Sequence, residues 1–240
     1  MIDDLNYKVR WSWFIMIKEN LRFIKERIQI AAAKRGVSPE DITLIAVTKT
    51  VSAEMVRAAW DLGVTDFGEN RVQDALPKIQ TLPADLRWHF IGHLQTNKVK
   101  NVLPAFMLIH SLDSLRLAQA LQNEGEKQKQ VVHALVQVNI GSEESKSGFA
   151  FEEVIPALKE MAALSALKIQ GLMAIAPFTD DPESVRPLFR RLFELYSSIQ
   201  IRDVEMKYLS MGMSNDFEVA VEEGANMIRL GTSIFGERNY

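Results

Sequence analysis

The stretch TLIAVTKT, residues 43–50, holds the pattern that decides the fold. Its apolar run LIAV, residues 44–47, is typical of a strand that is buried on both faces, as in a parallel sheet. The run leads to Lys49, a side chain of a type that resists burial. Either the strand reaches the surface and the ammonium lies in water, or Lys49 is partly desolvated and is a candidate Schiff-base nucleophile.

The chain repeats this strand pattern, and helical segments separate the strand candidates. The first such helix begins after Ser52, its expected N-cap, and ends at Asp61. The eight strand candidates are TLIAVTK, TDFGEN, RWHFIGH, FMLIHSLD, VVHALVQVNI, KIQGLMAIAP, KYLSMGMS and NMIRLGTSIFG. Regular alternation over roughly 200 residues predicts an α/β fold, a single (β/α)8 barrel of the TIM type. A doubly wound open sheet is the alternative, but the chain lacks its Gly-x-Gly-x-x-Gly motif after the first strand.

The composition argues against several classes of function. The chain has 240 residues, a formal net charge of −3 and no cysteine. That charge and the lack of a basic run argue against nucleic-acid binding. Without cysteine there is no disulfide, thiolate nucleophile or cysteine-type zinc site. His89 and His93 have no neighbouring ligand residues, so we expect no metal site, and His89 alternates with Trp88 and Phe90 and should point into the barrel.

Residues 1–16 form an N-terminal extension ahead of the barrel domain. The apolar cluster WSWFIMI, residues 11–17, is too short to span a bilayer and lacks the features of a signal peptide. The next segment has Leu21, Ile24 and Ile28 at helical spacing, and Gly36 ends it. We therefore expect a soluble extension, a helix before the first strand, a barrel domain over residues 17–240 and a cytoplasmic location.

The ends of the last two strand candidates are suited to binding a phosphate group. In a TIM-type barrel the loops after strands 7 and 8 often do so. Ser214 stands just before the expected helix NDFEVAVEEGA, whose N-terminus favours negative charge. Gly231 and Thr232, expected within the last strand, offer a close backbone approach and a hydroxyl donor. With Lys49 on the other side, this arrangement indicates a phosphorylated aldehyde held as an imine.

Pyridoxal phosphate (PLP) meets that description, because desolvation favours the neutral amine of Lys49 that an imine requires. Arg229 stands two residues before Gly231 and is placed to face the pyridine nitrogen. An arginine keeps its proton, so it would leave that nitrogen unprotonated and make the ring a poor electron sink. An ion pair of Arg229 with Glu69 or Glu218 is the alternative interpretation.

Several segments together resemble the pyridoxal 5'-phosphate homeostasis protein family (YggS/PROSC type): AVTKT, FGENRVQD, WHFIGHLQTNK, LVQVNIGSEESKSGF, GLMAI and LSMGMSNDFEVAVEEGANMIRLGTSIFG. The resemblance extends from about Ile17 to Gly236. It implies a fold similar to the barrel domain of alanine racemase, which is the fold-type III arrangement for PLP. It also implies PLP bound covalently to Lys49 as an internal aldimine. The cofactor-binding residues that it implies are Lys49, Asn70, Met211, Ser214, Arg229, Gly231 and Thr232.

The resemblance implies a PLP-binding protein of vitamin B6 homeostasis that delivers PLP to apo-enzymes and has no catalytic turnover. A fold-type III amino-acid racemase is the first alternative, but it needs a second acid or base opposite the lysine. Only ERNY follows the last strand segment, so we expect no room for that group. A Schiff-base aldolase for a sugar phosphate is the second alternative, and Arg229 and the resemblance argue against it.

The sequence also leads to expectations about the partners of the chain and about a second lysine, Lys146. We expect a monomer that contacts PLP and PLP-dependent apo-enzymes, with neither nucleic acid nor a membrane as a partner. Lys146 lies in the polar loop GSEESKSGF. A solvated loop lysine is the favoured interpretation, and the alternative is a second amine that accepts PLP during transfer. The extension over residues 1–16 is longer than is usual in the family, and its role stays open.

Overall fold

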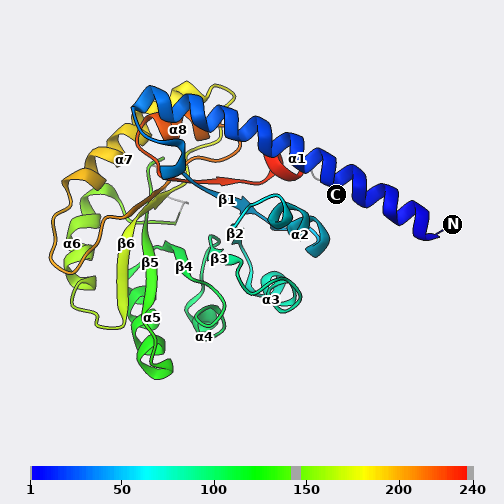
Figure 1. Cartoon of the computed structure of the whole chain (residues 1–240). Helices are drawn as coiled ribbons and strands as arrows, with labels where there is room; N and C mark the ends of the chain where they lie inside the picture. Colours follow the sequence, from blue (N-terminus) through cyan, green and yellow to red (C-terminus); the bar gives the residue numbers. More distant parts are fainter. Residues whose placement is uncertain (1, 142–146, 237–240) are drawn as a thin grey trace.

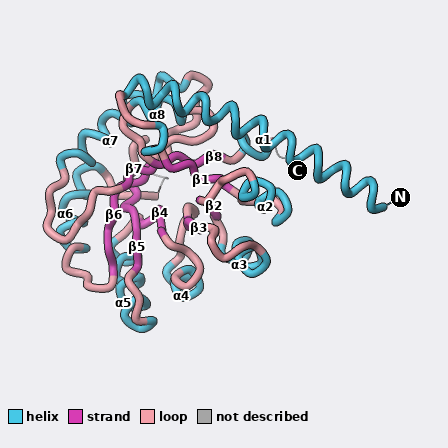
Figure 2. Tube along the Cα trace, in the orientation of Figure 1, coloured by secondary structure: helices cyan, strands magenta, loops and turns pink. Residues whose placement is uncertain are grey.

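The computed structural model describes residues 2–141 and 147–236. In this part of the chain, eight parallel strands close into a barrel in sequence order, and the first strand pairs with the last (Figure 2). The strands are β1 (Thr43–Val47), β2 (Asp66–Glu69), β3 (Arg87–Phe90), β4 (Leu108–Leu112), β5 (Val132–Val138), β6 (Leu167–Ala174), β7 (Tyr208–Ser210) and β8 (Met227–Leu230). The expected (β/α)8 barrel is confirmed, and every strand candidate coincides with one of these strands, although β6 begins one residue before its candidate, at Leu167.

Helices surround the barrel on its outside (Figure 1). They are α1 (Ile2–Arg35), α2 (Ala53–Asp61), α3 (Val72–Thr81), α4 (Val99–Val102), α5 (Leu115–Gln128), α6 (Phe151–Met161), α7 (Arg186–Ser198), α8 (Phe217–Glu222) and α9 (Thr232–Phe235). Short 3-10 helices lie at Pro39–Asp41, Thr96–Lys98 and Pro182–Val185. Ser52 caps α2 as expected, because its hydroxyl accepts a hydrogen bond from the Met55 N–H at 3.4 Å.

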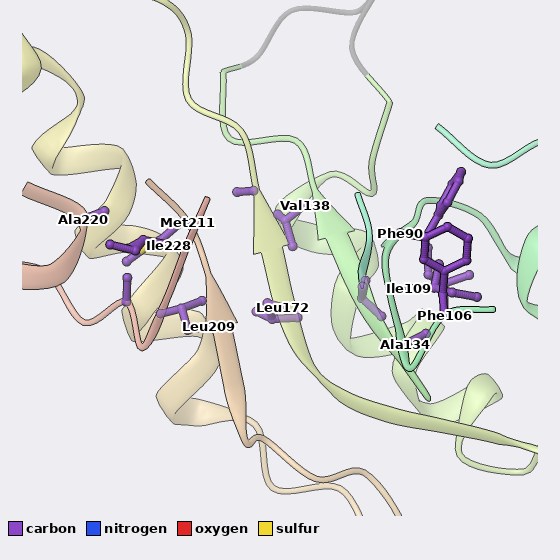
Figure 3. Packing of buried hydrophobic residues seen from close by; sticks show 14 of the residues in the cluster. Phe90, Phe106, Ile109, Ala134, Val138, Leu172, Leu209, Met211, Ala220 and Ile228 are labelled. Carbon is purple, nitrogen blue, oxygen red and sulfur yellow. The ribbon is translucent and has the colours of Figure 1, made fainter. Parts of the chain in front are cut away.

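The main core lies between the barrel and the helices, and we call it the outer layer. Side chains alternate along a strand, so every second residue faces the helices and the others face the barrel interior. Figure 3 shows part of the outer layer, including Phe90, Phe106 and Ile109. A separate apolar cluster fills the interior, and Tyr208 packs against it; its members are Ile45, Leu108, Leu135, Met173 and Met227. The barrel is therefore filled by side chains.

Helix α1 includes the extension and continues without a break to Arg35. Residues 2–16 contain neither proline nor glycine, so nothing in the sequence ends the helix there. Among the side chains that are described, the first buried one on α1 is Ile17, followed by Leu21, Ile24 and Ile28. Figure 1 shows the part before them projecting beyond the barrel. Within the described ranges, no helix combines the length and the apolar character that crossing a membrane requires.

The last strand is shorter than expected. It ends at Leu230, and α9 begins at Thr232 with Gly231 as its N-cap, so these two residues do not continue the strand. The cause is local: the Gly231 carbonyl accepts hydrogen bonds from the N–H groups of Ile234 at 3.0 Å and Phe235 at 2.9 Å. These bonds turn the chain into a helix directly after β8.

Helix α8 also begins later than the sequence suggests. Its first residue is Phe217 and its N-cap is Asp216, so Ser214 lies in the loop ahead of the cap. The Asp216 carboxylate accepts a hydrogen bond from the Met213 N–H at 2.6 Å and closes a turn in that loop. Ser214 therefore belongs to the turn, and its contacts are set by the loop rather than by the helix.

Candidate functional site

Lys49 lies just beyond the carboxyl end of β1, where active sites of this architecture are found. By alternation it shares the interior-facing side of Ile45, and its side chain is half-buried. The peptide before it is fixed on both sides. The Thr48 N–H donates to the Gly68 carbonyl at 2.9 Å, and the Thr48 carbonyl accepts from Lys78 Nζ at 2.7 Å. Lys49 is thus carried to the mouth of the barrel on a rigid support.

A buried ion pair supports this strand end from the helix side. Glu69, the last residue of β2, is fully buried. Its Oε1 accepts hydrogen bonds from Thr48 Oγ1 at 2.7 Å and from Lys78 Nζ at 2.6 Å. Lys78 lies on α3, and 12% of its side chain is exposed. The pair therefore ties the ends of β1 and β2 to α3.

Asn70 follows β2 at the same end of the barrel. Gly92 packs so closely against it that a Cβ on Gly92 would lie 2.3 Å from the Asn70 carbonyl oxygen. The side-chain Oδ1 of Asn70 is buried and has no hydrogen-bond partner among the described residues. An unpaired buried amide oxygen is costly. This atom therefore marks a position where a hydrogen-bonding ligand group would fit.

The loop after β7 and the start of α9 gather hydrogen-bond donors. Ser214 Oγ accepts from the N–H groups of Gly231 and Ser233, each at 3.4 Å. Gly231 lies beside β1, because a Cβ at this position would be 3.5 Å from the side chain of Val47. Thr232 is exposed at the rim. The structure thus brings the three expected phosphate ligands together, next to the strand that leads to the expected cofactor lysine.

Met211 is the expected site residue whose side chain points elsewhere. It is fully buried in the outer layer with Leu209 and Ile228 (Figure 3). Alternation explains this, because Ser210 faces the interior and the next residue must face the helices. The Met211 N–H donates to the Met227 carbonyl at 3.1 Å. Met211 therefore supports the ends of β7 and β8 from behind.

Arg229 lies on β8 and is 4% exposed. Its Nη1 donates to Ser210 Oγ at 2.6 Å, and its Nη2 donates to the Ala174 carbonyl at 2.8 Å. Burial lowers the pKa of Arg229 to about 10, and the nearby Asp216 carboxylate opposes that shift. The guanidinium is therefore still charged at neutral pH.

The two carboxylates considered as ion-pair partners of Arg229 are bound elsewhere. Glu69 pairs with Lys78 at 2.6 Å, and Glu218 pairs with Arg27 through bonds of 2.9 Å and 2.5 Å. The ion-pair interpretation is therefore wrong for both residues. The hydrogen bonds of Arg229 to the described residues go to neutral acceptors instead.

Arg229 is also one end of a hydrogen-bonded row across the barrel interior, which we call the interior chain. Its five members come from five strands and are all buried: Arg229, Ser210, His110, His89 and Asp66. Ser210 Oγ lies 3.0 Å from His110 Nδ1. His110 Nε2 lies 3.0 Å from His89 Nδ1, and His89 Nε2 lies 2.9 Å from Asp66 Oδ1. The row thus links Arg229, the arginine expected to face the cofactor, to a carboxylate.

The electrostatics of the interior chain follow from its burial. Burial lowers the pKa of His110 well below its usual value, and His89 and Arg229 add to the effect. For Asp66, burial alone would raise the pKa, but hydrogen bonds from His89 and from Arg87 outweigh it and lower the pKa. His110 is therefore neutral and Asp66 is ionised at neutral pH.

The interior chain was only partly visible in the sequence. His89 is expected to point inward, and this is confirmed by its contacts with His110 and Asp66, while Trp88 and Phe90 lie in the outer layer. Asp66 and His110 carry no prediction, although a polar residue inside a buried strand, as in LIHSL at residues 108–112, is a usable signal. Lys146 lies outside the described residues. Within the described ranges, no cluster of His, Asp and Glu is suited to hold a metal ion.

Comparison with known proteins places the chain in a family. The family model "Alanine racemase, N-terminal domain" matches residues 17–239. A pyridoxal phosphate homeostasis protein of Aquifex aeolicus is 45% identical over 224 residues, which cover 92% of this chain and 98% of the relative. The protein of the same name from Escherichia coli is 39% identical, over 93% of this chain and 97% of the relative.

Solved structures support the same family and fold. PipY of Synechococcus elongatus, determined with PLP bound, is 35% identical and superposes with a TM-score of 0.76 over 89% of this chain and 100% of its own. An alanine racemase of Clostridium difficile has a TM-score of 0.72 at 16% identity, over 92% of this chain and 60% of its own, a likeness that shows the fold alone. With its alanine racemase-type barrel and these relatives, the chain belongs to the family of pyridoxal phosphate homeostasis proteins.

Proposed function

We propose that this protein binds PLP and acts in PLP homeostasis, holding the cofactor and passing it to apo-enzymes. The observation that carries the proposal is the convergence of groups at the carboxyl end of the barrel. There the structure gathers Lys49, the donors around Ser214 and the buried Arg229. The names of the relatives and the PLP-bound structure of PipY support the same function.

The phosphate of PLP would be held by Ser214, Gly231 and Thr232 through hydroxyl and backbone N–H donors. Nothing in the described packing requires a glycine at position 231. Its φ is negative, and a Cβ there would make only an ordinary contact with Val47. We attribute the glycine to the close approach of a ligand.

The pyridine ring would lie between Asn70 and Arg229. The unpaired Oδ1 of Asn70 fits a ligand group at that place, and a side-chain amide can offer either an acceptor or donors. Arg229 has five N–H donors, of which the structure assigns two to protein acceptors. Since arginine has no acceptor, its partner on the ring would be an unprotonated nitrogen.

Lys49 would attach the cofactor covalently. Its neutral amine would condense with the aldehyde of PLP to give a C=N bond, with release of water. Bound PLP can act as an electron sink, and an arginine at the ring nitrogen weakens that capacity. An acid or base on the opposite face, which racemisation requires, is not among the site residues described above. These residues fit holding PLP better than turnover, so we infer a carrier.

The proposal places the protein in the cytoplasm as a monomer whose partners are PLP-dependent apo-enzymes. If the protein delivers PLP directly, the PLP-loaded protein should restore activity to such an apo-enzyme faster than free PLP at the same concentration. Light scattering of the purified protein gives the oligomeric state. An unchanged rate of reactivation would contradict direct transfer.

The covalent link is tested by visible absorption after addition of PLP and by peptide mass after borohydride reduction. Lys49→Ala should abolish both the absorption band and the mass addition on that peptide. Lys100→Ala, at an exposed position on α4, is the matched control and should retain both. Wild-type protein without the band would contradict PLP binding. A band that persists in Lys49→Ala would contradict the attachment site.

A further inference from the structure

The hydrogen atoms of the interior chain can be assigned by counting donors and acceptors. Arginine has donors and no acceptor, so Ser210 Oγ must accept from Arg229 Nη1. A serine hydroxyl has one proton, and His110 Nδ1 lies 3.0 Å from Ser210 Oγ as the acceptor that this proton needs. His110 Nδ1 is therefore unprotonated, and a neutral His110 must carry its proton on Nε2.

The same count continues to the carboxylate. His110 Nε2–H donates to His89 Nδ1, which must then be unprotonated. His89 carries its proton on Nε2 and donates it to Asp66 Oδ1. Every proton of the row therefore points from Arg229 towards Asp66. The opposite direction would need a doubly protonated His89 and would leave the Ser210 proton without an acceptor in the row.

The far end of the row is anchored at the start of the strands. Asp66 accepts from Arg87 Nε at 2.9 Å and from Arg87 Nη2 at 2.5 Å. Thr65 Oγ1 also donates to Asp66, at 2.8 Å. Because its carboxylate is held by these donors, Asp66 cannot turn away, and the ring of His89 is fixed in orientation.

We propose that the interior chain positions the guanidinium of Arg229 for its PLP partner: His110 and Ser210 present a fixed acceptor to it, and Asp66 fixes their direction through His89. These four are positioning residues, since they would act on the ligand through Arg229. The proposal rests on the proposed function only for the identity of the ligand. It explains how an arginine whose hydrogen bonds go to neutral acceptors keeps one orientation, because the negative ends of the aligned dipoles face it and add to the effect of the nearby Asp216 carboxylate.

The direction of the row is tested first, without cofactor. Nitrogen NMR of the PLP-free protein with labelled histidine should show the ring proton of both His110 and His89 on Nε2 at neutral pH. Assignment uses His110→Gln and His89→Gln, each of which removes one set of signals. A protonated Nδ1 on either ring would overturn the proposal.

The positioning role is tested by PLP titration. Ser210→Ala removes the acceptor of Arg229 and should weaken PLP binding about tenfold, and Ser210→Thr, which keeps the hydroxyl, should restore most of the affinity. His133→Gln, a half-buried histidine outside the row, is the matched control and should bind like the wild type. Circular dichroism checks that each variant is folded.

The outcomes separate this inference from the proposed function. Wild-type affinity in folded Ser210→Ala would overturn the positioning role while leaving PLP binding intact. A wild-type protein that binds no PLP would overturn the proposed function, and the positioning role with it. A weakened Ser210→Ala that Ser210→Thr does not rescue would show a packing defect and would also overturn the role.

Discussion

The two sides of the barrel wall are held together by different interactions. The outer layer is apolar over most of its extent, and it packs the strands against the helices. The interior holds a small apolar cluster and, beside it, the interior chain. Apolar packing is non-directional and many sequences satisfy it, whereas a buried polar row needs a particular partner at each position. We therefore expect the outer side to supply most of the stability and the inner side to influence what the mouth can bind.

The largest effect is expected in the outer layer. Phe189 on α7 is fully buried there, so Phe189→Ala should cost about 4 kcal/mol of unfolding free energy, through lost burial and the cavity left behind. Phe178→Ala, at a side chain that is 87% exposed, is the matched control and should change stability by less than about 0.5 kcal/mol. Urea unfolding measures both. Equal losses of unfolding free energy in the two variants would contradict the comparison, because burial in the outer layer would then not determine the contribution of a side chain to stability.

The outer layer could be predicted from the sequence because its signals are local. The run LIAV at residues 44–47 and the cap at Ser52 each depend on a few neighbouring residues. The sequence predictions of element boundaries were wrong where such local signals are weak. The helix before the first strand begins at Ile2, and β8 ends at Leu230 because of hydrogen bonds made by the Gly231 carbonyl.

The site could be predicted only in part. Lys49 and Arg229 stand at strand ends or in buried strands, so their residue type and position already suggest chemistry. Met211 came from the resemblance, which names a residue but not the direction of its side chain. The contact of His110 with His89 joins two strands, and it depends on a register that pairs His89 with Leu108. Such a register is a property of the closed barrel and has no local signature.

The buried ion pair of Glu69 and Lys78 is a polar feature of the outer layer, and it sharpens the comparison. Lys78→Met leaves Glu69 charged and buried without its cation, which should cost about 3 kcal/mol. Lys127→Met, at a lysine whose side chain is 73% exposed, is the matched control. Chemical denaturation gives both values. If Lys78→Met lost no more unfolding free energy than Lys127→Met, polar groups in the outer layer would contribute as little to stability as those at the surface.

An effect of pH is expected from the interior chain. The pKa of Asp66 is lowered in the folded protein, so its stabilisation is complete above the unfolded value of about 4 and is lost as pH falls below it. Asp66→Asn keeps the shape and removes the charge, and should cost about 2 kcal/mol at pH 7. That difference should shrink as pH falls below about 4. Urea unfolding at pH 7, 5 and 3 measures it, and a constant difference would contradict the lowered pKa.

The smallest effect is expected for a charged pair that belongs to neither side of the wall. Asp61 accepts a hydrogen bond from Arg57 at 3.1 Å on the outer face of α2, and their side chains are 44% and 50% exposed. Asp61→Ala should change stability by no more than about 0.5 kcal/mol, because water screens the pair and an acid at a helix C-terminus is itself unfavourable. Thermal unfolding of Asp61→Ala beside Lys78→Met compares an exposed charged pair with a buried one. A larger loss of stability in Asp61→Ala than in Lys78→Met would show that burial does not determine how much a charged pair contributes to the stability of this barrel.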